Sequence, residues 1–422
     1  MSESVPGFTP YQKFVVAILS FLQFTIILDF MIMAPLGAIM MPALNMTTAQ
    51  FGVVVSAYAF SAGAAGLLAA GFADRYDRKK LLIFFYTGFV IGTLLCGLAP
   101  NYPFLVAARV VTGLFGGVIG SIVFAITTDL FPMEKRGRVM GFIQTAFAAS
   151  QIIGLPAGLY FSNLWGWHAP FFMIVAVGSI VGLFIFFYLK PIDAHLHLNV
   201  DHNPLRHLSK TLANRHYHLA FGATALLSIG GFLLMPFGSN FTVHNMGIHV
   251  DNLPIIYLVT GIFSIVIGPL VGRAADRLGK MPVFTFGSLL SIVMVLIYTH
   301  MGTSTLPIVI LVNTVMFVGI FSRMIPSQVL MSAIPEASMR GSFMSVSSSL
   351  QSIAGGCASV VAGMIVVQRA DGFVEHFDTL GYIMVGTALV ALLMMTLINR
   401  AVSRKLAAAP VPTPVPTDVP SH

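Results

Sequence analysis

Charged side chains are scarce in this chain: Asp, Glu, Lys and Arg together make up 9% of its 422 residues. Hydrophobic residues make up 57%, and the mean hydropathy is +0.89, both far outside the averages of soluble proteins. The length alone would suggest a soluble protein of two or three domains, but this composition excludes that class. It is the composition of an integral membrane protein.

Cysteine is also rare, because Cys96 and Cys357 are the only two in the sequence. Both lie inside apolar runs, so no disulfide framework is expected and each is interpreted as a small packing residue. The enzyme motifs H-E-x-x-H, G-x-S-x-G and the Walker sequence are absent as well. An intramembrane enzyme would need a nucleophile or metal cluster of this kind, whereas a receptor or structural scaffold stays open as an alternative.

The chain contains many long apolar runs. A helix needs roughly 20 residues to cross a hydrocarbon layer of ~30 Å. The predicted spans lie near residues 14–36, 50–70, 81–99, 104–127, 139–161, 170–189, 217–237, 254–272, 282–299, 307–331, 343–367 and 380–398. The first run is full length and contains Asp29 and Pro35, so it is interpreted as a retained span and not as a removable signal peptide.

The net charge of +7 is distributed unevenly between the predicted loops. If both termini face the cytosol, 19 of the 22 Lys and Arg residues fall in the two termini and the cytosolic loops. Arg369 alone falls in an outer loop, and Arg109 and Arg323 lie inside spans. This asymmetry follows the positive-inside rule. The basic residues therefore indicate orientation and attraction to the lipid bilayer, and not a nucleic-acid partner.

Two short charged stretches repeat the same pattern in the two halves of the chain: GFADRYDRKK, from Gly71 to Lys80, and GRAADRLGK, from Gly272 to Lys280. The matching residues are 202 positions apart: Asp74 with Asp276, Arg75 with Arg277, and Arg78 with Lys280. A second repeat, Arg136-Gly137 with Arg340-Gly341, has an offset of 204. Since both copies must lie on one side of the membrane, an even number of spans separates them, and six per half fits.

We therefore predict an N-terminal six-helix bundle (1–190), a cytosolic linker (191–216), a C-terminal six-helix bundle (217–400) and a disordered cytosolic tail (401–422). Six histidines lie in or beside the linker: His195, His197, His202, His207, His216 and His218. Their spacing matches no known zinc site. A solvated hinge is the preferred interpretation, with metal binding as the alternative.

Together these features resemble the major facilitator superfamily, whose members have repeated six-helix halves. The resemblance includes the DRxGRK-type loop from Asp74 to Lys79, an R-x-x-x-G motif from Arg109 to Gly113, and a GLPAG motif from Gly154 to Gly158. Short segments such as SRMIPSQ and RGSFMS are similar to segments of bacterial proton-coupled efflux proteins of the drug and arabinose exporter type. The departures are Asp77 and Ala70 in place of the usual glycines of the charged loop, and Gly-Leu-Pro in place of Gly-Pro.

The resemblance implies an all-α membrane protein with twelve transmembrane helices in two pseudo-symmetric bundles. It also implies a place in the bacterial cytoplasmic (inner) membrane with both termini in the cytosol. We expect a monomer that needs no cofactor and uses the proton as coupling ion.

In the resembling family the charged loops act as a latch on the cytosolic side. We expect Asp74 to meet the helix that begins near Arg340, and Asp276 to meet the helix near Arg136, because a helix N-terminus and arginine side chains both attract a carboxylate. The same loops contain Arg75, Arg78, Gly272 and Arg277. The alternative is that these cations only fix orientation and attract anionic lipid.

Asp29 alone among the fifteen acids lies deep within a predicted span, where an Asp costs roughly 2.5–3.5 kcal/mol. A rise of 1.5 Å per residue places both Asp29 and Arg109 about 22 Å from the cytosolic side, so we expect the two to meet. Burial favours a neutral carboxyl and a nearby guanidinium favours a charged one. We therefore expect Asp29 to exchange protons with the outside solution, with a permanent structural ion pair as the alternative.

Other polar residues in the spans are candidates for lining a substrate cavity: Gln23, Gln144, Gln151, Asn313, Arg323 and Gln351. Hydrogen bonds between helices are the alternative role for the amides, and snorkelling or gating is the alternative for Arg323. Gly154, Pro156 and Gly158 are expected to bend the fifth span and let it pack closely. Asp129 is expected to pair with Lys135 or Arg136.

The leading hypothesis is a proton-coupled exporter of small organic molecules, neutral or amphipathic, that works by alternating access. A facilitator or symporter of sugars, metabolites or lipid-like molecules is the alternative within the same fold.

Overall fold

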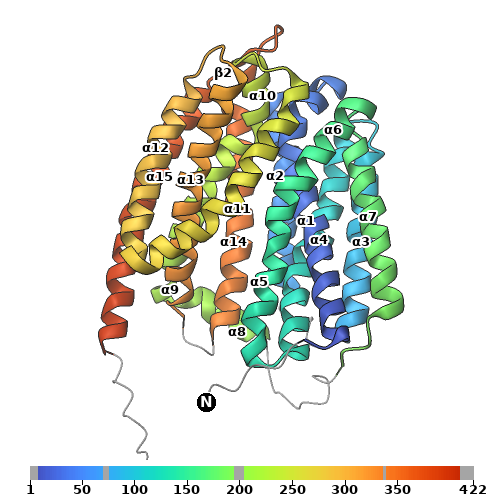
Figure 1. The fold of residues 1–422 in the computed structure, drawn as a ribbon, viewed down its shortest axis with the longest axis vertical. Coiled ribbons are helices and arrows are strands. Elements are labelled where there is room, and N and C mark those ends of the chain that lie inside the picture. Colours follow the sequence, from blue (N-terminus) through green and yellow to red (C-terminus); the bar gives the residue numbers. More distant parts are fainter. Residues whose placement is uncertain (1–7, 70–75, 194–203, 336–338, 409–422) are drawn as a thin grey trace, which may run out of the picture.

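The computed structural model describes residues 8–69, 76–193, 204–335 and 339–408, and helices form nearly all of it (Figure 1). The first half contains α1 (Pro10–Ala43), α2 (Thr48–Ala69), α3 (Arg78–Gly97), α4 (Tyr102–Leu130), α5 (Met133–Ala149), the π-helix η2 (Ser150–Gly154), α6 (Leu155–Trp165) and α7 (Ala169–Tyr188). The connection contains α8 (Pro204–Ala213). The second half contains α9 (Arg215–Leu234), η4 (Met235–Phe237), α10 (Gly238–His244), η5 (Val250–Asn252), α11 (Leu253–Leu278), α12 (Lys280–Thr299), α13 (Leu306–Ser332), α14 (Arg340–Ile365), β1 (Val367–Gln368), β2 (Val374–Glu375) and α15 (Phe377–Ala408).

Twelve helical segments within the described residues are long and apolar enough to cross a membrane. Each coincides with one of the predicted spans, so the expected all-α fold and its number of spans are confirmed. Where helices begin, short polar side chains satisfy free backbone N–H groups. Thr9 and Gln12 form a capping box at α1, and Asn101 accepts from the backbone N–H of Phe104 at α4.

The fifth span is a single rod made of three pieces, α5, η2 and α6. Pro156 has no N–H to donate to the preceding turn, and the wider π turn from Ser150 to Gly154 lies directly before it. The seventh span is also interrupted, by the 3₁₀ turn η4, which contains Pro236 and lies between α9 and α10. Such irregular turns inside long helices are frequent at functional sites.

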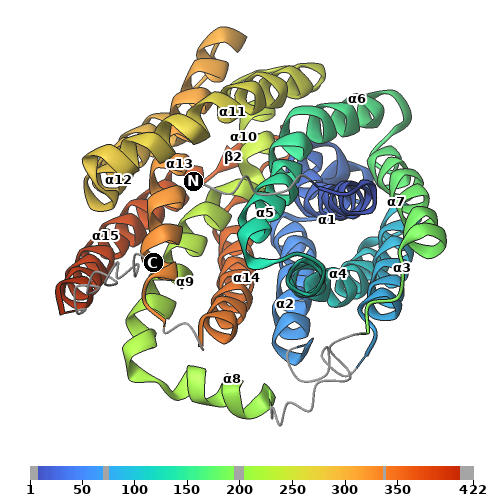
Figure 2. The same cartoon turned by 60° about the horizontal axis from the view of Figure 1, so that its bottom comes forward.

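The two halves lie side by side, and α8 crosses between them on the face where α1 begins and α15 ends (Figure 2). We call this face the terminal face. On the opposite face, β1 and β2 pair antiparallel, with Val367 opposite Glu375 and Gln368 opposite Val374. We call this the hairpin face.

Two segments differ from the sequence expectation. The expected polar linker contains the helix α8, in which Leu205, Leu208 and Leu212 recur at helical spacing, so it is a short amphipathic helix. The last span continues as α15 to Ala408, past the expected boundary at 400, because the segment is rich in alanine, lysine and arginine, which are strong helix formers. The histidines at 195, 197 and 202 lie outside the described residues.

Glycines bring the two halves into backbone contact where α2 meets α14. A Cβ atom added at Gly52 would lie 2.6 Å from the Ser359 carbonyl oxygen, and one added at Gly363 would lie 2.7 Å from the Thr48 oxygen. The Thr48 hydroxyl donates to the Val366 oxygen at 2.6 Å. These contacts join the halves at the hairpin face.

Candidate functional site

Asp29 and Arg109 meet in the interior of the first half. Asp29 lies on α1 and Arg109 on α4, and their side chains are 0% and 1% exposed. Arg109 Nη1 donates to Asp29 Oδ2 at 2.8 Å, and Thr93 on α3 donates its hydroxyl to Asp29 Oδ1 at 3.0 Å. Each carboxylate oxygen therefore has one donor, and the depth estimated from the sequence places the pair together as the structure does.

Tyr58 on α2 completes the surroundings of the pair. The guanidinium carbon of Arg109 lies 4.5 Å from the centre of the Tyr58 ring, a distance at which a cation is attracted to a ring face. Gly113 makes this possible, because a Cβ atom there would lie 2.5 Å from the Tyr58 carbonyl oxygen. The R-x-x-x-G motif thus supplies both the cation and the close approach of α2 to α4. Arg109 Nε is buried and has no hydrogen-bond partner.

This arrangement holds a charge pair in a buried interior, with one group that can change its charge. A carboxyl can take up a proton, whereas an arginine remains protonated. Protonation of Asp29 would leave the guanidinium beside the Tyr58 ring without a counter-charge among the described residues. The pair therefore has two states that differ by one full charge.

Thr93 and Tyr58 were not among the residues predicted from the sequence. Thr93 lies fifteen residues into α3, about 22 Å from its start at 1.5 Å per residue, so the depth argument that paired Asp29 with Arg109 would also have found it. Tyr58 carries no comparable signal, because its role depends on how closely α2 approaches α4.

The charged loop of the first half is partly visible. Asp74 and Arg75 lie outside the described residues, and so does the side chain of Arg340, although α14 begins at that residue as expected. Arg78 Nε donates to Asp129 Oδ2 at 3.1 Å and ties α3 to α4. Asp129 was expected to pair with Lys135 or Arg136, and Arg78 is a partner that the sequence did not indicate.

Arg136 caps the end of α4 through the backbone. Its guanidinium donates to the Thr128 oxygen at 2.7 Å and to the Phe131 oxygen at 2.9 Å, which are carbonyl groups that a helix C-terminus leaves unpaired.

The charged loop of the second half is open to solvent in this structure. Asp276 is 79% exposed and pairs with Lys280 one turn further along the chain at 3.6 Å. Arg277 is exposed too, and Gly272 has no atom within 4 Å of the place where a Cβ would lie. The expected contact of Asp276 with the helix near Arg136 stays a prediction for another conformation.

The polar residues expected in a substrate cavity do not form one cluster. Gln144 and Gln351 are exposed, and Asn313 donates to the Val309 oxygen on its own helix. Gln23 and Gln151 each have a buried amide oxygen without a partner. Arg323 is 7% exposed, and its Nε and Nη2 atoms have no partner.

The helix-bending residues bring the fifth span against α1. A Cβ atom at Gly154 would lie 2.7 Å from Leu28 Cδ1, and the Cβ of a residue replacing Gly158 would lie 2.8 Å from Ile32 Cδ1. Close packing and the irregular turn before Pro156 thus occur together.

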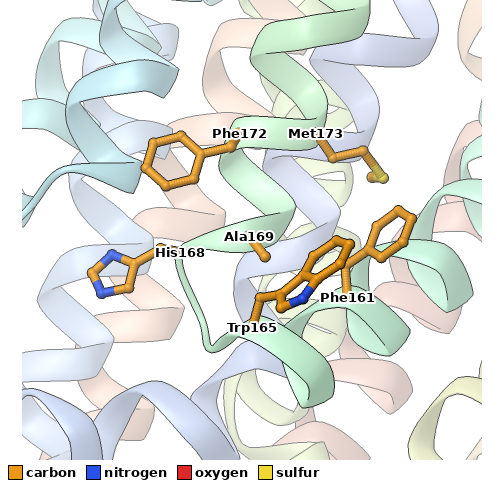
Figure 3. A pocket seen from close by; sticks show the side chains of 6 residues that line it. All are labelled: Phe161, Trp165, His168, Ala169, Phe172 and Met173. Carbon is orange, nitrogen blue, oxygen red and sulfur yellow. The ribbon is translucent and has the colours of Figure 1, made fainter.

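An apolar pocket of about 430 Å³ lies away from the ion pair, between α6 and α7 (Figure 3). It is lined by Phe161, Trp165, His168, Ala169, Phe172 and Met173. Trp165 is 70% exposed, and exposed aromatic side chains at span ends are typical of the membrane interface. We therefore interpret this pocket as part of the lipid-facing surface.

Comparison with known proteins gives a consistent result. The family model of the Major Facilitator Superfamily matches residues 19–359 and 220–417. The uncharacterized MFS-type transporter YceJ of Bacillus subtilis is 26% identical over 387 residues, which cover 89% of this chain and 93% of that protein. Multidrug resistance protein 3 of Bacillus subtilis is 32% identical over 152 residues, which are 36% of this chain and only 30% of the length of that protein.

Solved structures share the same fold at low sequence identity. A bacterial homolog of the human lysosomal transporter Spinster, in an inward-facing conformation, has a TM-score of 0.70 at 16% identity and covers 96% of this chain and all of its own. A D-xylose-proton symporter has the same TM-score and identity and covers 90% of this chain and 97% of its own.

Twelve membrane-spanning helices in two repeated halves, the buried charge pair on the first and fourth spans, and a family model that covers most of the sequence lead to one conclusion: the chain is a membrane transporter that belongs to the Major Facilitator Superfamily.

Proposed function

We propose that this transporter exports small organic molecules by alternating access, driven by protons that enter through Asp29. The observation that carries the proposal is the Asp29–Arg109 pair, which is fully buried and joined at 2.8 Å. Asp29 is the only acid buried inside a span among the described residues. An ionisable group within the membrane is expensive and is by default a functional residue.

Protonation changes what holds the first half together. With Asp29 charged, the pair draws α1 and α4 together. With Asp29 neutral, the Coulomb attraction is lost, and the two helices can adopt another relative position. A proton moving down its gradient would in this way select between two arrangements of the bundle.

A line of aromatic rings extends from the pair to the second half. The Phe30 ring, next in sequence to Asp29, lies 5.5 Å from the Tyr58 ring and 5.7 Å from the Phe232 ring on α9. The Tyr58 ring in turn contacts the Arg109 guanidinium. We infer that a shift at the pair moves Phe30 against Phe232 and so acts on the interface between the halves.

The direction of transport is supported by orientation and by relatives. The excess of Lys and Arg on the terminal face indicates that this face lies in the cytosol, which makes the hairpin face the proton entry side. Two similar proteins of Bacillus subtilis are named multidrug resistance proteins, which supports efflux through a bacterial cytoplasmic membrane.

The test is flux across proteoliposomes that contain the purified transporter under an imposed pH gradient. The probes are ethidium as a cation, phenylacetate as an acid and arabinose as a neutral sugar. We expect the wild type to move at least one probe against the proton flow. Asp29→Asn should abolish the effect of the pH gradient on this flux. The control Asp251→Asn, which changes a 64% exposed carboxylate, should leave the effect of the gradient unchanged. Gradient-driven flux in Asp29→Asn with the wild-type pH dependence would refute the proposal.

A further inference from the structure

In the described part of the second half, one buried cation has no acid beside it. Arg323 on α13 is 7% exposed, and its Nε and Nη2 atoms lack hydrogen-bond partners. The one acid buried inside a span in the described part of the chain, Asp29, is already held by Arg109 in the other half. An uncompensated buried charge is strongly destabilising, and arginine cannot lose its proton. A counter-charge from outside the described protein would remove this penalty.

Three serine hydroxyls at a similar depth also lack hydrogen-bond partners. The hydroxyl oxygens of Ser288 and Ser291 on α12 and of Ser347 on α14 are buried without partners. Counted from the ends of their helices at the terminal face, Arg323 and the three serines all lie about 10–17 Å into the bundle at 1.5 Å per residue. We call these four residues the C-half polar layer.

Helical spacing places these residues on helix faces that border one apolar cluster. Ser288 follows Phe284 by four residues, Ser347 follows Phe343 by four, and Arg323 precedes Leu330 by seven. Positions four and seven apart share a helix face. Phe284, Phe343 and Leu330 belong to a single buried cluster, so each polar residue lies on the face of its helix that borders this cluster. α12 packs directly on α13, whereas the main neighbours of α14 are α2 and α9.

The layer combines one positive charge with three hydroxyl groups that can donate hydrogen bonds. A guanidinium binds a carboxylate through two parallel N–H bonds, and such charge-assisted bonds are roughly twice as strong as neutral ones. Serine hydroxyls can donate to the same group. We propose that the C-half polar layer binds the oxyanion of the transported molecule, so that the substrate class is small amphipathic molecules with a single carboxylate or similar oxyanion.

This proposal rests on the proposed function and narrows its substrate class. Counted from the expected span ends at the terminal face, residues 331 and 14, Arg323 lies eight residues and Asp29 fifteen residues into the membrane. At 1.5 Å per residue these depths are about 12 Å and about 22 Å. The anion site is therefore closer to the expected cytosolic loading side, and the proton site is closer to the opposite side.

The first test is the stability of the ligand-free protein. Removing an unpaired buried charge relieves a penalty, so Arg323→Gln in neutral phosphatidylcholine nanodiscs should melt at the same temperature as the wild type or higher. A marked drop in the melting temperature would mean that Arg323 has a partner within the protein, and would overturn the proposal.

The second test is equilibrium binding of matched pairs of small molecules, without a pH gradient: phenylacetate with phenylacetamide, and benzoate with benzamide. The wild type should bind at least one acid about tenfold more tightly than its amide, and Arg323→Gln should remove this preference, since a charge-assisted bond is lost. Arg323→Lys should keep part of it. The matched control is Arg369→Gln, which removes an exposed cation and should change nothing. Equal binding of each acid and its amide by the wild type would refute the site.

The third test separates a substrate from a lipid as the source of the oxyanion. If phosphatidylglycerol raises the melting temperature of the wild type but not of Arg323→Gln, and no acid is preferred over its amide, the occupant is a lipid phosphate and the proposed substrate class is wrong. Asp29→Asn should keep the preference for acids, because binding needs no proton coupling. Failure of anion binding and failure of proton coupling are thus distinguishable.

Discussion

At the scale of single residues, the two partners of the buried pair are not equivalent. A carboxyl left without its cation can become neutral by taking up a proton, but a guanidinium left without its anion stays charged. Thr93 would remain as a hydrogen-bond donor to Asp29, whereas Arg109 would keep the Tyr58 ring beside its charge but no anion. Loss of the acid should therefore be the more damaging change.

We accordingly predict that Asp29→Asn destabilises the protein more than Arg109→Gln. Breaking a buried pair by removing one partner costs about 3–5 kcal/mol, and we expect Asp29→Asn to reach that range and Arg109→Gln to fall below it. The double variant should be more stable than Asp29→Asn. Chemical unfolding in one detergent would measure all three, and equal losses in the two single variants would contradict the asymmetry.

The Arg78–Asp129 pair at the terminal face gives a second prediction. Arg78 is 6% exposed and Asp129 is 22% exposed, and hydrogen bonds to charged groups contribute about 1.5–3 kcal/mol. We expect Asp129→Asn to lower the stability by an amount in that range and to leave gradient-driven flux intact. A variant that is fully stable but loses coupling would give Asp129 a role in transport that this account does not include.

How far the sequence predicts the site depends on where a residue lies. Inside the bilayer, depth follows from counting residues along straight helices, which is why Asp29 and Arg109 were paired correctly. In loops, counting residues does not give a depth, and the Arg78–Asp129 contact depends on how the chain turns between spans. Tyr58 was missed for a related reason, because the approach of α2 to α4 depends on Gly113 and not on the character of Tyr58.

At the scale of helices, Gly52 and Gly363 let the backbones of α2 and α14 touch across the two halves. We predict that Gly52→Ala opens the hairpin face, because its Cβ would lie 2.6 Å from the Ser359 carbonyl oxygen. A cysteine at the fully buried Ser359, in a background without Cys96 and Cys357, should then react faster with a maleimide.

The matched control for this variant is Gly386→Ala, since nothing lies within 4 Å of the Cβ position at Gly386. It should leave the labelling rate unchanged. If Gly52→Ala labels no faster than Gly386→Ala, the two backbones do not touch as described.

The Phe30–Phe232 contact predicts how helices of the two halves communicate. Phe232→Ala should weaken gradient-driven flux while leaving the stability effect of Asp29→Asn unchanged, because the ion pair is not touched. Residues on a coupling route typically change it by about 0.5–2 kcal/mol, which is a severalfold loss of flux. The control is Phe286→Ala, at a ring that is 58% exposed. Equal flux in both variants would exclude this route.

At the scale of the whole molecule, the number of spans, the duplication and the expected orientation follow from apolar run length, the 202-residue repeat and the uneven distribution of basic residues. The pairing of helices across the two halves does not follow from the sequence. All faces of a membrane-spanning helix are apolar, so its hydrophobic pattern does not show which face meets the other half. The sequence also gives no sign of which face is closed, since alternating conformations share one sequence.

The central claim is that Asp29 is the proton carrier, and the most direct measurement is charge movement after a pH jump. Proteoliposomes with the purified transporter, adsorbed on a solid-supported membrane, would be shifted from about pH 8 to about pH 6, which drives protons towards the ionisable group within the membrane. We predict a transient current in the wild type and in Asp251→Asn, and none in Asp29→Asn. A current of wild-type size in Asp29→Asn would contradict the account.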